Sequence, residues 1–259
     1  MNHSHDLSGK IAVITGAAQG IGLASAAMLA RSGVDIVALD LAGTNWQALE
    51  AAVTAAGRTL LKVEGDVADE TTWSRLDSSV RADFGRIDIL FNNAGISGPR
   101  SPLADYPLDA FDKVMEVNCR GVFLGMKHGA ALMDGGSGSI INMSSVSGLG
   151  GGRSLFAYNA SKHAVIGLTK VGAVELAERK VRVNAICPAM TDTAMMQSLE
   201  TGKSANEIAA LRGHFAGMIP MARYAHADEV AAVVLFLASD AASFVTGAAI
   251  PIDGGLKAQ

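Results

Sequence analysis

Short apolar runs alternate with longer stretches in which apolar residues recur at helical spacing, along almost the whole chain. The runs are rich in β-branched residues and end at glycine or at a polar residue, which is typical of strands buried in a parallel sheet. The longer stretches have the period of helices that cover such a sheet. We therefore predict strands at residues 10–15, 34–39, 59–64, 87–91, 139–143, 181–186 and 248–252, and helices at 21–31, 45–56, 70–84, 108–132, 158–178 and 228–238.

Strands that alternate with helices of roughly ten or more residues form right-handed βαβ units, with helices on both faces of a parallel sheet. No segment has the composition of a linker, so we predict one α/β domain over residues 1–259, with a doubly wound sheet of about seven strands. Residues 190–218 have no clear period and several methionines. A long segment of this kind in a compact domain is usually functional or disordered, so we expect a mobile substrate lid there. Residues 1–6 are expected to be a flexible tail.

Composition narrows the possible functions. Hydrophobic residues make up 49% of the chain and charged residues 18%, which is enough for a large core. The net charge of −4 and the lack of a basic stripe argue against nucleic-acid binding. Cys119 and Cys187 form neither a disulfide framework nor a metal-ligand pattern, and we expect no metal. No apolar run reaches the roughly 20 residues of a membrane span, and the start does not resemble a signal peptide, so we expect a cytoplasmic protein with no membrane partner.

A glycine-rich loop, TGAAQGIG at residues 15–22, lies between the first predicted strand and the first predicted helix. Glycines let the backbone approach a pyrophosphate, and the helix N-terminus supplies free N–H groups and a partial positive charge. The spacing is G-x-x-x-G-x-G rather than the G-x-G-x-x-G of the common fingerprint. In its strand–turn–helix context the loop predicts dinucleotide binding.

Asp40 ends the second predicted strand, 18 residues after Gly22. A carboxylate at this place can accept both adenosine ribose hydroxyls of NAD, whereas the 2′-phosphate of NADP would place like charges side by side. No Arg or Lys follows at residues 41–43, and Gln19 stands in the loop where a basic residue would meet that phosphate. These residues predict NAD as the cofactor.

Tyr158 and Lys162 lie four residues apart on a predicted helix, and so on one face of it. A phenol has an ordinary pKa of about 10. An ammonium about 4 Å away, at an effective dielectric constant near 20, would stabilise the phenolate by roughly 4 kcal/mol. We therefore expect Lys162 to lower the pKa of Tyr158 into the range of a general acid/base.

Taken together, these motifs resemble the short-chain dehydrogenase/reductase family of compact, single-domain, Rossmann-type enzymes, over residues 7–255. The loop at 15–22 corresponds to TGxxxGIG and residues 92–95 to NNAG. Asn118 is similar to the family's helix asparagine, residues 142–145 to its serine motif, Tyr158 to Lys162 to YxxxK, and 184–188 to the segment beside the nicotinamide. The family pattern places the serine thirteen residues before the tyrosine, which selects Ser145 over Ser144.

The resemblance implies roles for these residues. Ser145 would hydrogen-bond the substrate oxygen, Tyr158 would transfer the proton, Lys162 would also hold the nicotinamide ribose, and Asn118 would anchor a relay water. Asp66 would bind the adenine amino group. The cofactor-binding residues implied are Gly16, Gln19, Gly20, Ile21, Gly22, Asp40, Leu41, Asp66, Val67, Asn93, Ala94, Gly95, Tyr158, Lys162, Pro188, Thr191 and Thr193. The activity implied is reversible hydride transfer between NAD and a secondary alcohol or its ketone.

Two alternatives remain open at this point. An NADPH-dependent 3-oxoacyl-type reductase is opposed by Asp40, and a non-catalytic dinucleotide-binding regulator is opposed by the intact Ser145, Tyr158 and Lys162. The residues do not select a substrate. An apolar wall is suggested by Leu149, Phe156, Met190, Met195, Met196 and Leu199, whereas a polyol or carboxylate would suit Ser97, Arg153, Asn159 and His214.

The last predicted strand, 248–252, is apolar on both faces, and such an edge strand aggregates unless something covers it. The resemblance implies a homotetramer in which a neighbouring subunit covers this strand and the helices at 108–132 and 158–178 form a second interface. Some relatives that end in glutamine bind Mg²⁺ at the symmetry axis, which makes Gln259 a minor candidate for a metal ligand.

Overall fold

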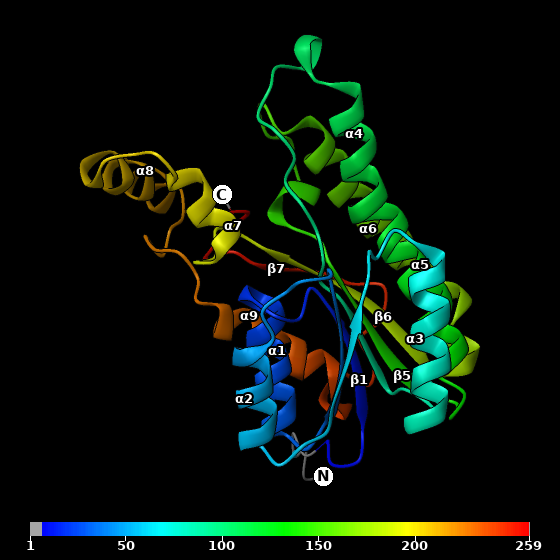
Figure 1. Ribbon diagram of the computed structural model, residues 1–259. Helices are drawn as coiled ribbons and strands as arrows, with labels where there is room; N and C mark the ends of the chain where they lie inside the picture. Colours follow the sequence, from blue (N-terminus) through cyan, green and yellow to red (C-terminus); the bar gives the residue numbers. More distant parts are fainter. Residues whose placement is uncertain (1–6, 259) are drawn as a thin grey trace.

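The computed structural model describes residues 7–258; the side chain of Leu199, the expected tail at 1–6 and the candidate metal ligand Gln259 lie outside the described part. A seven-stranded parallel sheet forms the centre, in the order β3-β2-β1-β4-β5-β6-β7. The strands are β1 Ile11–Thr15, β2 Asp35–Asp40, β3 Leu60–Glu64, β4 Ile89–Asn92, β5 Gly138–Met143, β6 Val181–Pro188 and β7 Ala249–Ile252. The predicted single α/β domain with a doubly wound sheet is confirmed (Figure 1).

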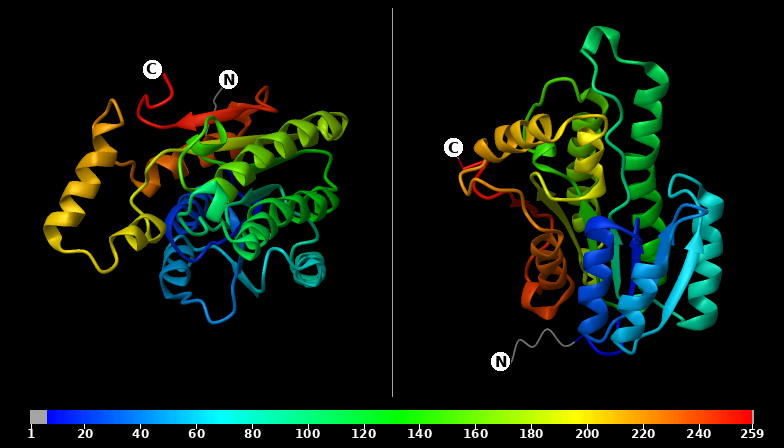
Figure 2. Two further views of the ribbon diagram at one scale, coloured as in Figure 1. Left: turned by 90° about the horizontal axis from the view of Figure 1, so that it is seen from above. Right: turned by 60° about the vertical axis from the view of Figure 1, so that its left-hand side comes forward.

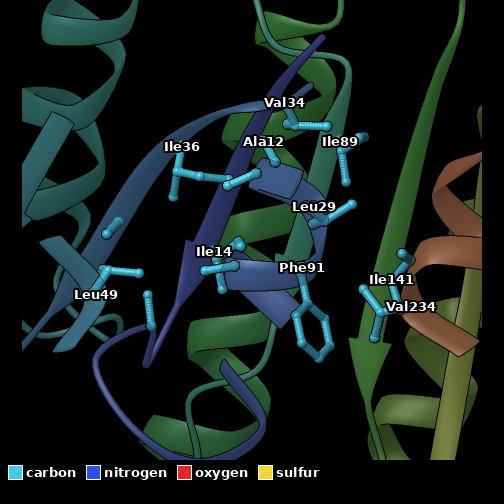
Figure 3. Packing of buried hydrophobic residues seen from close by; sticks show 14 of the residues in the cluster. Ala12, Ile14, Leu29, Val34, Ile36, Leu49, Ile89, Phe91, Ile141 and Val234 are labelled. Atoms are coloured by element: carbon cyan, nitrogen blue, oxygen red, sulfur yellow. The ribbon is translucent and has the colours of Figure 1, made fainter. Parts of the chain in front are cut away.

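Helices cover both faces of this sheet because each central strand is apolar on both sides. On β1, Ala12 and Ile14 face one core, whereas Ile11 and Val13 face the other. The first core contains Leu29, Leu49 and Val234 from the helices of that face, as Figure 3 shows. Those helices are α1 Gly20–Arg31, α2 Gln47–Ala55 and α9 Ala227–Ala238. The opposite core is covered by α3 Glu70–Asp83, α5 Gly121–Leu132 and α6 Phe156–Glu175.

The order of the strands creates a crevice at the carboxyl edge of the sheet. After β1 the chain builds outward through β2 to β3, then crosses back to place β4 on the other side of β1. The loops that follow β1 and β4 therefore leave the sheet in opposite directions, and ligands of doubly wound sheets bind at such a switch point. The glycine-rich loop follows β1, and the residues 93–95 follow β4.

The predicted helix at 108–132 is helical throughout but is not one regular α-helix. It consists of α4 Leu108–Met115, a π-helical turn Glu116–Arg120 and α5 Gly121–Leu132. A π turn inserts one extra residue per turn, and such turns occur frequently at functional sites. The buried side chain of Asn118 lies in this turn.

Residues 190–218, where the sequence shows no clear period, are largely helical. The segment contains α7 Ala194–Gln197, a 3-10 turn Ser198–Glu200 and α8 Ala205–Gly217. The helix α8 begins with a capping box, in which Ser204 and Glu207 exchange side-chain-to-backbone hydrogen bonds. It buries no residue within the chain and stands away from the body (Figures 1 and 2). A helix with no buried stripe has no apolar period, so the pattern could not indicate it.

The remaining 3-10 turns are Leu103–Asp105, Val146–Gly148, Ala177–Arg179 and Asp240–Ala242. The turn at Ala177–Arg179 ends α6 three residues before the predicted boundary, and Lys180 follows it in the left-handed conformation, with φ of 56°. Within residues 7–258, the structure has no helix long and apolar enough to cross a membrane.

Candidate active site

The glycine-rich loop has the geometry of a pyrophosphate cradle. Gly16 and Gly20 have φ of 61° and 54°, a region that side chains other than glycine rarely occupy. A Cβ on Gly22 would collide with the carbonyl oxygen of Gly16. The loop therefore needs glycine at these three positions, and Ile21 follows Gly20 in the first turn of α1.

Thr15 ties this loop to the NNAG segment. Its Oγ1 accepts the N–H groups of Asn93 and Ala94, both at 3.0 Å. The Asn93 side-chain amide donates to the Thr15 carbonyl at 2.9 Å and to the Gly16 carbonyl at 3.0 Å. Two segments that are 77 residues apart thus form one rigid wall of the crevice. The sequence motif included Thr15, but its role as an acceptor needed the β1–β4 pairing to be known.

Asp40 lines an open pocket of about 620 Å³ together with Ala18, Gln19, Thr44, Asn45, Gln47 and Ala48. Its Oδ2 accepts the Ala18 N–H at 3.1 Å and its Oδ1 accepts the Leu41 N–H at 2.9 Å. These bonds aim the carboxylate at the glycine-rich loop. No lysine or arginine lines this pocket. The structure thus brings Gln19 and Asp40 together as expected, while Leu41 is exposed beside them.

Both carboxylate oxygens of Asp66 accept hydrogen bonds from other residues of the chain. Its Oδ1 accepts the Ala68 N–H at 2.9 Å, and its Oδ2 accepts from the Lys113 ammonium at 3.1 Å. That hydrogen bond raises the pKa of Lys113. The neighbouring Val67 is buried against Gly121, where a Cβ would lie 2.8 Å from the valine side chain. Sequence reasoning missed Lys113, which approaches from α4, 47 residues away.

Ser145, Tyr158 and Lys162 meet at the carboxyl ends of β5 and β6. The Ser145 hydroxyl lies close enough to the Tyr158 phenol to lower its pKa. The Ser145 hydroxyl also donates to the Pro188 carbonyl at 3.4 Å and accepts the Ser147 N–H at 3.1 Å. The Lys162 ammonium lies 5.5 Å from the centre of the Tyr158 ring and donates to the Met143 carbonyl at 2.8 Å. Ser144 instead bonds to the Lys162 carbonyl at 2.9 Å, which supports the selection of Ser145.

Burial, rather than the lysine, dominates the ionisation of this cluster. Burial raises the pKa of Tyr158, and the neighbouring Ser145 hydroxyl opposes this rise. Burial also lowers the pKa of Lys162 from 10.5 to about 8. The expectation that Lys162 depresses the pKa of Tyr158 is therefore wrong for this structure. The ammonium is directed at a backbone carbonyl, and a buried site penalises the charged form of both groups.

Asn118 holds the loop after NNAG in place. Its Oδ1 accepts the Ile96 N–H and its Nδ2 donates to the Ile96 carbonyl, both at 2.8 Å. The same Nδ2 donates to Ser161 at 3.0 Å. A Cβ on Gly95 would lie 3.1 Å from Asn118 Oδ1 and 3.4 Å from the Lys162 ammonium, so glycine keeps this end of the crevice open.

The segment after β6 closes over the glycine-rich loop. Thr193 lies beside Gly20: a Cβ added to that glycine would lie 3.5 Å from the threonine methyl group. Thr191 is buried, pairs with Ala225 in a short bridge and donates to the Ala189 carbonyl at 3.1 Å. Both threonines and Pro188 thus lie at the expected end of the crevice. Among residues 7–258, no three His, Cys, Asp or Glu side chains are grouped to hold a metal ion.

Known proteins share both this sequence and this fold. A family model described as enoyl-(acyl carrier protein) reductase matches residues 16–257. Levodione reductase from Leifsonia aquatica is 38% identical, over 96% of this chain and 94% of its own. The chain belongs to the short-chain dehydrogenase/reductase family. Cis-4-hydroxycyclohexanecarboxylate dehydrogenase from Sinomonas cyclohexanicum is 40% identical, over 96% of this chain and 97% of its own. The crystal structure of NAD⁺-bound xylitol dehydrogenase aligns with a TM-score of 0.88 at 37% identity, over 96% and 99% of the two chains.

As a member of the short-chain dehydrogenase/reductase family, this protein is an oxidoreductase that acts on CH–OH groups and interconverts alcohols and ketones. The family and its NAD⁺-bound structural neighbour indicate a nicotinamide cofactor. The glycine cradle and the open crevice beside Gly95 fit such a dinucleotide, since a Cβ at Gly16, Gly22 or Gly95 would meet the walls of the crevice.

Proposed function

We propose that this enzyme uses NAD(H) to interconvert a secondary alcohol on a six-membered carbon ring and the corresponding ketone. The observation that carries the proposal is the meeting of the buried Ser145 with the half-buried Tyr158, beside Lys162 and at the same sheet edge as the glycine-rich loop. Asn118, Ser145, Tyr158 and Lys162 are its catalytic residues, and the cofactor-binding residues are those named from the sequence.

The preference for NAD rests on the charge around Asp40. This carboxylate lines the pocket together with uncharged polar residues. A ribose 2′-phosphate of about −1.5 to −2 charge beside it would cost about 3–4 kcal/mol, on the order of 10²–10³ in kcat/KM. An NADPH-dependent reductase would need a cation here to compensate that charge.

The ring substrate is supported by the relatives and by the walls of the site. The name of the Sinomonas relative specifies a hydroxyl group on a cyclohexane ring. In this chain, the apolar side chains of Ile96 and Leu149, on loops, and of Phe156, at the start of α6, are exposed. Apolar walls of this kind suit a carbocycle better than a linear polyol, whose hydroxyls would lose their hydrogen bonds to water.

The residues of the site have separate roles in binding the substrate oxygen, transferring the proton and maintaining the geometry. When it is bound, the nicotinamide ring accepts or supplies the hydride. Ser145 and Tyr158 together hold the substrate oxygen, and Tyr158 gives it a proton during ketone reduction or removes one during alcohol oxidation. Burial raises the pKa of the phenol, so its proton is available for ketone reduction near neutral pH. Asn118 and Lys162 maintain the geometry through their bonds to Ile96 and Met143.

The assembly proposed with this function is a homotetramer. β7 is an edge strand, as predicted, and Phe244 just before it is fully exposed. A second apolar surface lies on α5 and α6, where Phe123, Val171 and Val174 are exposed. Single exposed apolar residues are common, but groups at an edge strand and on two adjacent helices are typical of subunit interfaces.

A substrate and cofactor panel tests the proposal. Three kinds of substrate would each be offered with NAD and with NADP: cyclohexanols, the linear polyol xylitol and a 3-hydroxyacyl thioester. The absorbance of the reduced cofactor would be followed. We expect the ring alcohols with NAD to give the highest kcat/KM. Asp40→Ala should narrow the preference for NAD at least tenfold, whereas Asp83→Ala, at an exposed position at the end of α3, should not. Equal use of both cofactors by the wild type, or turnover confined to the thioester, would contradict the proposal.

A further inference from the structure

The loop that joins Ser145 to Tyr158 is held in an unusually constrained conformation. It runs from Leu149 to Leu155, between a 3-10 turn and α6. The buried Asn159 donates to the Leu155 carbonyl at 2.8 Å and to the Gly152 carbonyl at 3.4 Å. The sequence suggested Asn159 as a substrate ligand. In the structure, its side-chain amide instead hydrogen-bonds to this loop.

Two further contacts fix the same loop from outside. The Ser101 N–H, from the loop that follows NNAG, donates to the Ser154 carbonyl at 3.0 Å. Lys257 reaches the other side, where its ammonium would lie 2.6 Å from a Cβ added at Gly150. Ser154 has φ of 63°, a left-handed conformation that is costly for serine. Backbone strain of this kind persists only when surrounding contacts impose it, and it is concentrated at sites that clamp ligands.

Arg153 belongs to this loop, between Gly152 and Ser154, whose carbonyl groups are held by these hydrogen bonds. It is exposed, and it makes no hydrogen bond or ion pair with any residue in the range 7–258. Arg100, directly before Ser101, is likewise exposed and unpaired among the described residues. The ammonium of Lys257 likewise has no ion pair with any residue in the range 7–258. Three cations without a side-chain partner thus lie on the loop between Ser145 and Tyr158 or on the two segments that contact it, in a protein whose net charge is −4.

Nearby acids do not neutralise this group. The carboxylate of Asp253 accepts the backbone N–H groups of Gly255 at 3.0 Å and Lys257 at 2.8 Å, so its hydrogen bonds go to the backbone that follows β7. Asp105 lies on the loop of Ser101, but its contact with Ser101 is through its carbonyl oxygen. The described residues show no ion pair to Arg153, Arg100 or Lys257, and cations without a partner favour an anionic ligand.

We propose that the substrate ring carries a carboxylate remote from the reacting carbon, and that Arg153 binds this carboxylate. The inference rests on the proposed function, since it places the reacting oxygen at Ser145 and Tyr158. A guanidinium presents a planar fork of N–H donors that matches a carboxylate in two parallel hydrogen bonds. Arg100 and Lys257 add positive charge without the same constraint. The fixed loop orients the ring so that its hydroxyl carbon, rather than its carboxylate, faces Tyr158.

A binding experiment tests this inference without turnover. Cyclohexanecarboxylate and the uncharged cyclohexanecarboxamide, which both lack the reacting hydroxyl, are titrated into the full-length enzyme saturated with NADH, with binding followed by saturation-transfer NMR. We expect the carboxylate to bind at least tenfold more tightly than the amide, and Arg153→Gln to remove this difference. Arg153→Lys should restore part of it, and Arg31→Gln, an exposed arginine at the end of α1, should leave it unchanged.

The results separate the inference from the function on which it rests. Equal binding of the two probes, no binding of either, or no effect of Arg153→Gln would overturn the inference, even if neutral ring alcohols are oxidised well. Tighter binding of inorganic phosphate than of the carboxylate would also overturn it. In kinetics, Arg153→Gln should raise KM for 4-hydroxycyclohexanecarboxylate at least tenfold with kcat within threefold, and should leave the methyl ester unaffected. The KM effect should shrink at 1 M salt, because exposed charges are screened.

Discussion

Replacing Lys162 with methionine should abolish activity and change how the stability of the enzyme depends on pH. Lys162 is buried, and burial lowers the pKa of its ammonium from 10.5 to about 8. The folded chain therefore binds this proton less tightly than the unfolded chain does. The stability contribution of the group is present above pH 10.5, decreases as the pH falls, and is lost below pH 8.

The magnitude follows from these two pKa values. An ammonium with a pKa of about 8 in the folded chain and 10.5 in the unfolded chain destabilises the fold by about 3 kcal/mol at pH 7. The same group costs about 2 kcal/mol at pH 9 and about 1 kcal/mol at pH 10. The free energy of unfolding of the wild type, relative to Lys162→Met, should thus rise by about 1 kcal/mol between pH 7 and pH 9. The lost hydrogen bond to the Met143 carbonyl changes the difference at every pH equally, so only the pH dependence reports the buried charge.

Urea denaturation of the apoenzyme at pH 7, 8 and 9 measures this effect. Tyr158 does not disturb the comparison, because burial keeps its pKa above 10 and the phenol stays neutral over this range. Lys170→Met, which removes an exposed lysine from the same helix, is the matched control and should run parallel to the wild type. Parallel curves for Lys162→Met and the wild type would show that the ammonium is not held in a desolvating site, and the proton chemistry assigned to the pair would have to be revised.

Three further outcomes are expected. Tyr158→Phe should reduce turnover by at least ~10²-fold, the usual contribution of a positioned acid/base, while NADH still binds by fluorescence; near-normal turnover would remove Tyr158 from the mechanism. Limited proteolysis of the apoenzyme should cut first within 190–218, where α8 buries nothing within the chain, and NADH should protect it; cutting elsewhere that NADH does not affect would contradict a lid. Deletion of residues 254–259 should reduce both the mass measured by light scattering and the activity, whereas a fully active monomer would refute the proposed tetramer.

The elements that the sequence predicted well are those that are buried on one or both faces. The seven strands lie within a few residues of their predicted positions because each is an apolar run. The glycine-rich loop was predictable because backbone collisions, such as the one at Gly22, permit few alternatives. The meeting of Ser145, Tyr158 and Lys162 followed from the resemblance to known motifs, since β5 and α6 are brought together only by the fold.

The features that the sequence did not predict depend on long-range contacts or on solvent. The pairing of Lys113 with Asp66 joins two segments whose distance along the chain gives no signal. The helix α8 has no buried stripe, so its capping box was the one local sign of it. The ionisation of Tyr158 was predicted wrongly because Coulomb's law was applied to the neighbouring charge alone, without the desolvation of both groups.

The π-helical turn at Glu116–Arg120 makes the enzyme more sensitive to the deletion of one residue than to single substitutions. One extra residue turns the helix by about 100° relative to a regular α-helix. This rotation allows α4 to pack beside α6 near the substrate entrance while α5 packs against α3 and β4. A deletion of one residue there would leave a regular helix of good propensity, but it would rotate one half away from its partners and carry Asn118 out of the site. Deletion of one residue from this segment should therefore inactivate the enzyme even where single substitutions around it do not. A mutational scan that includes single-residue deletions would compare the two kinds of mutation.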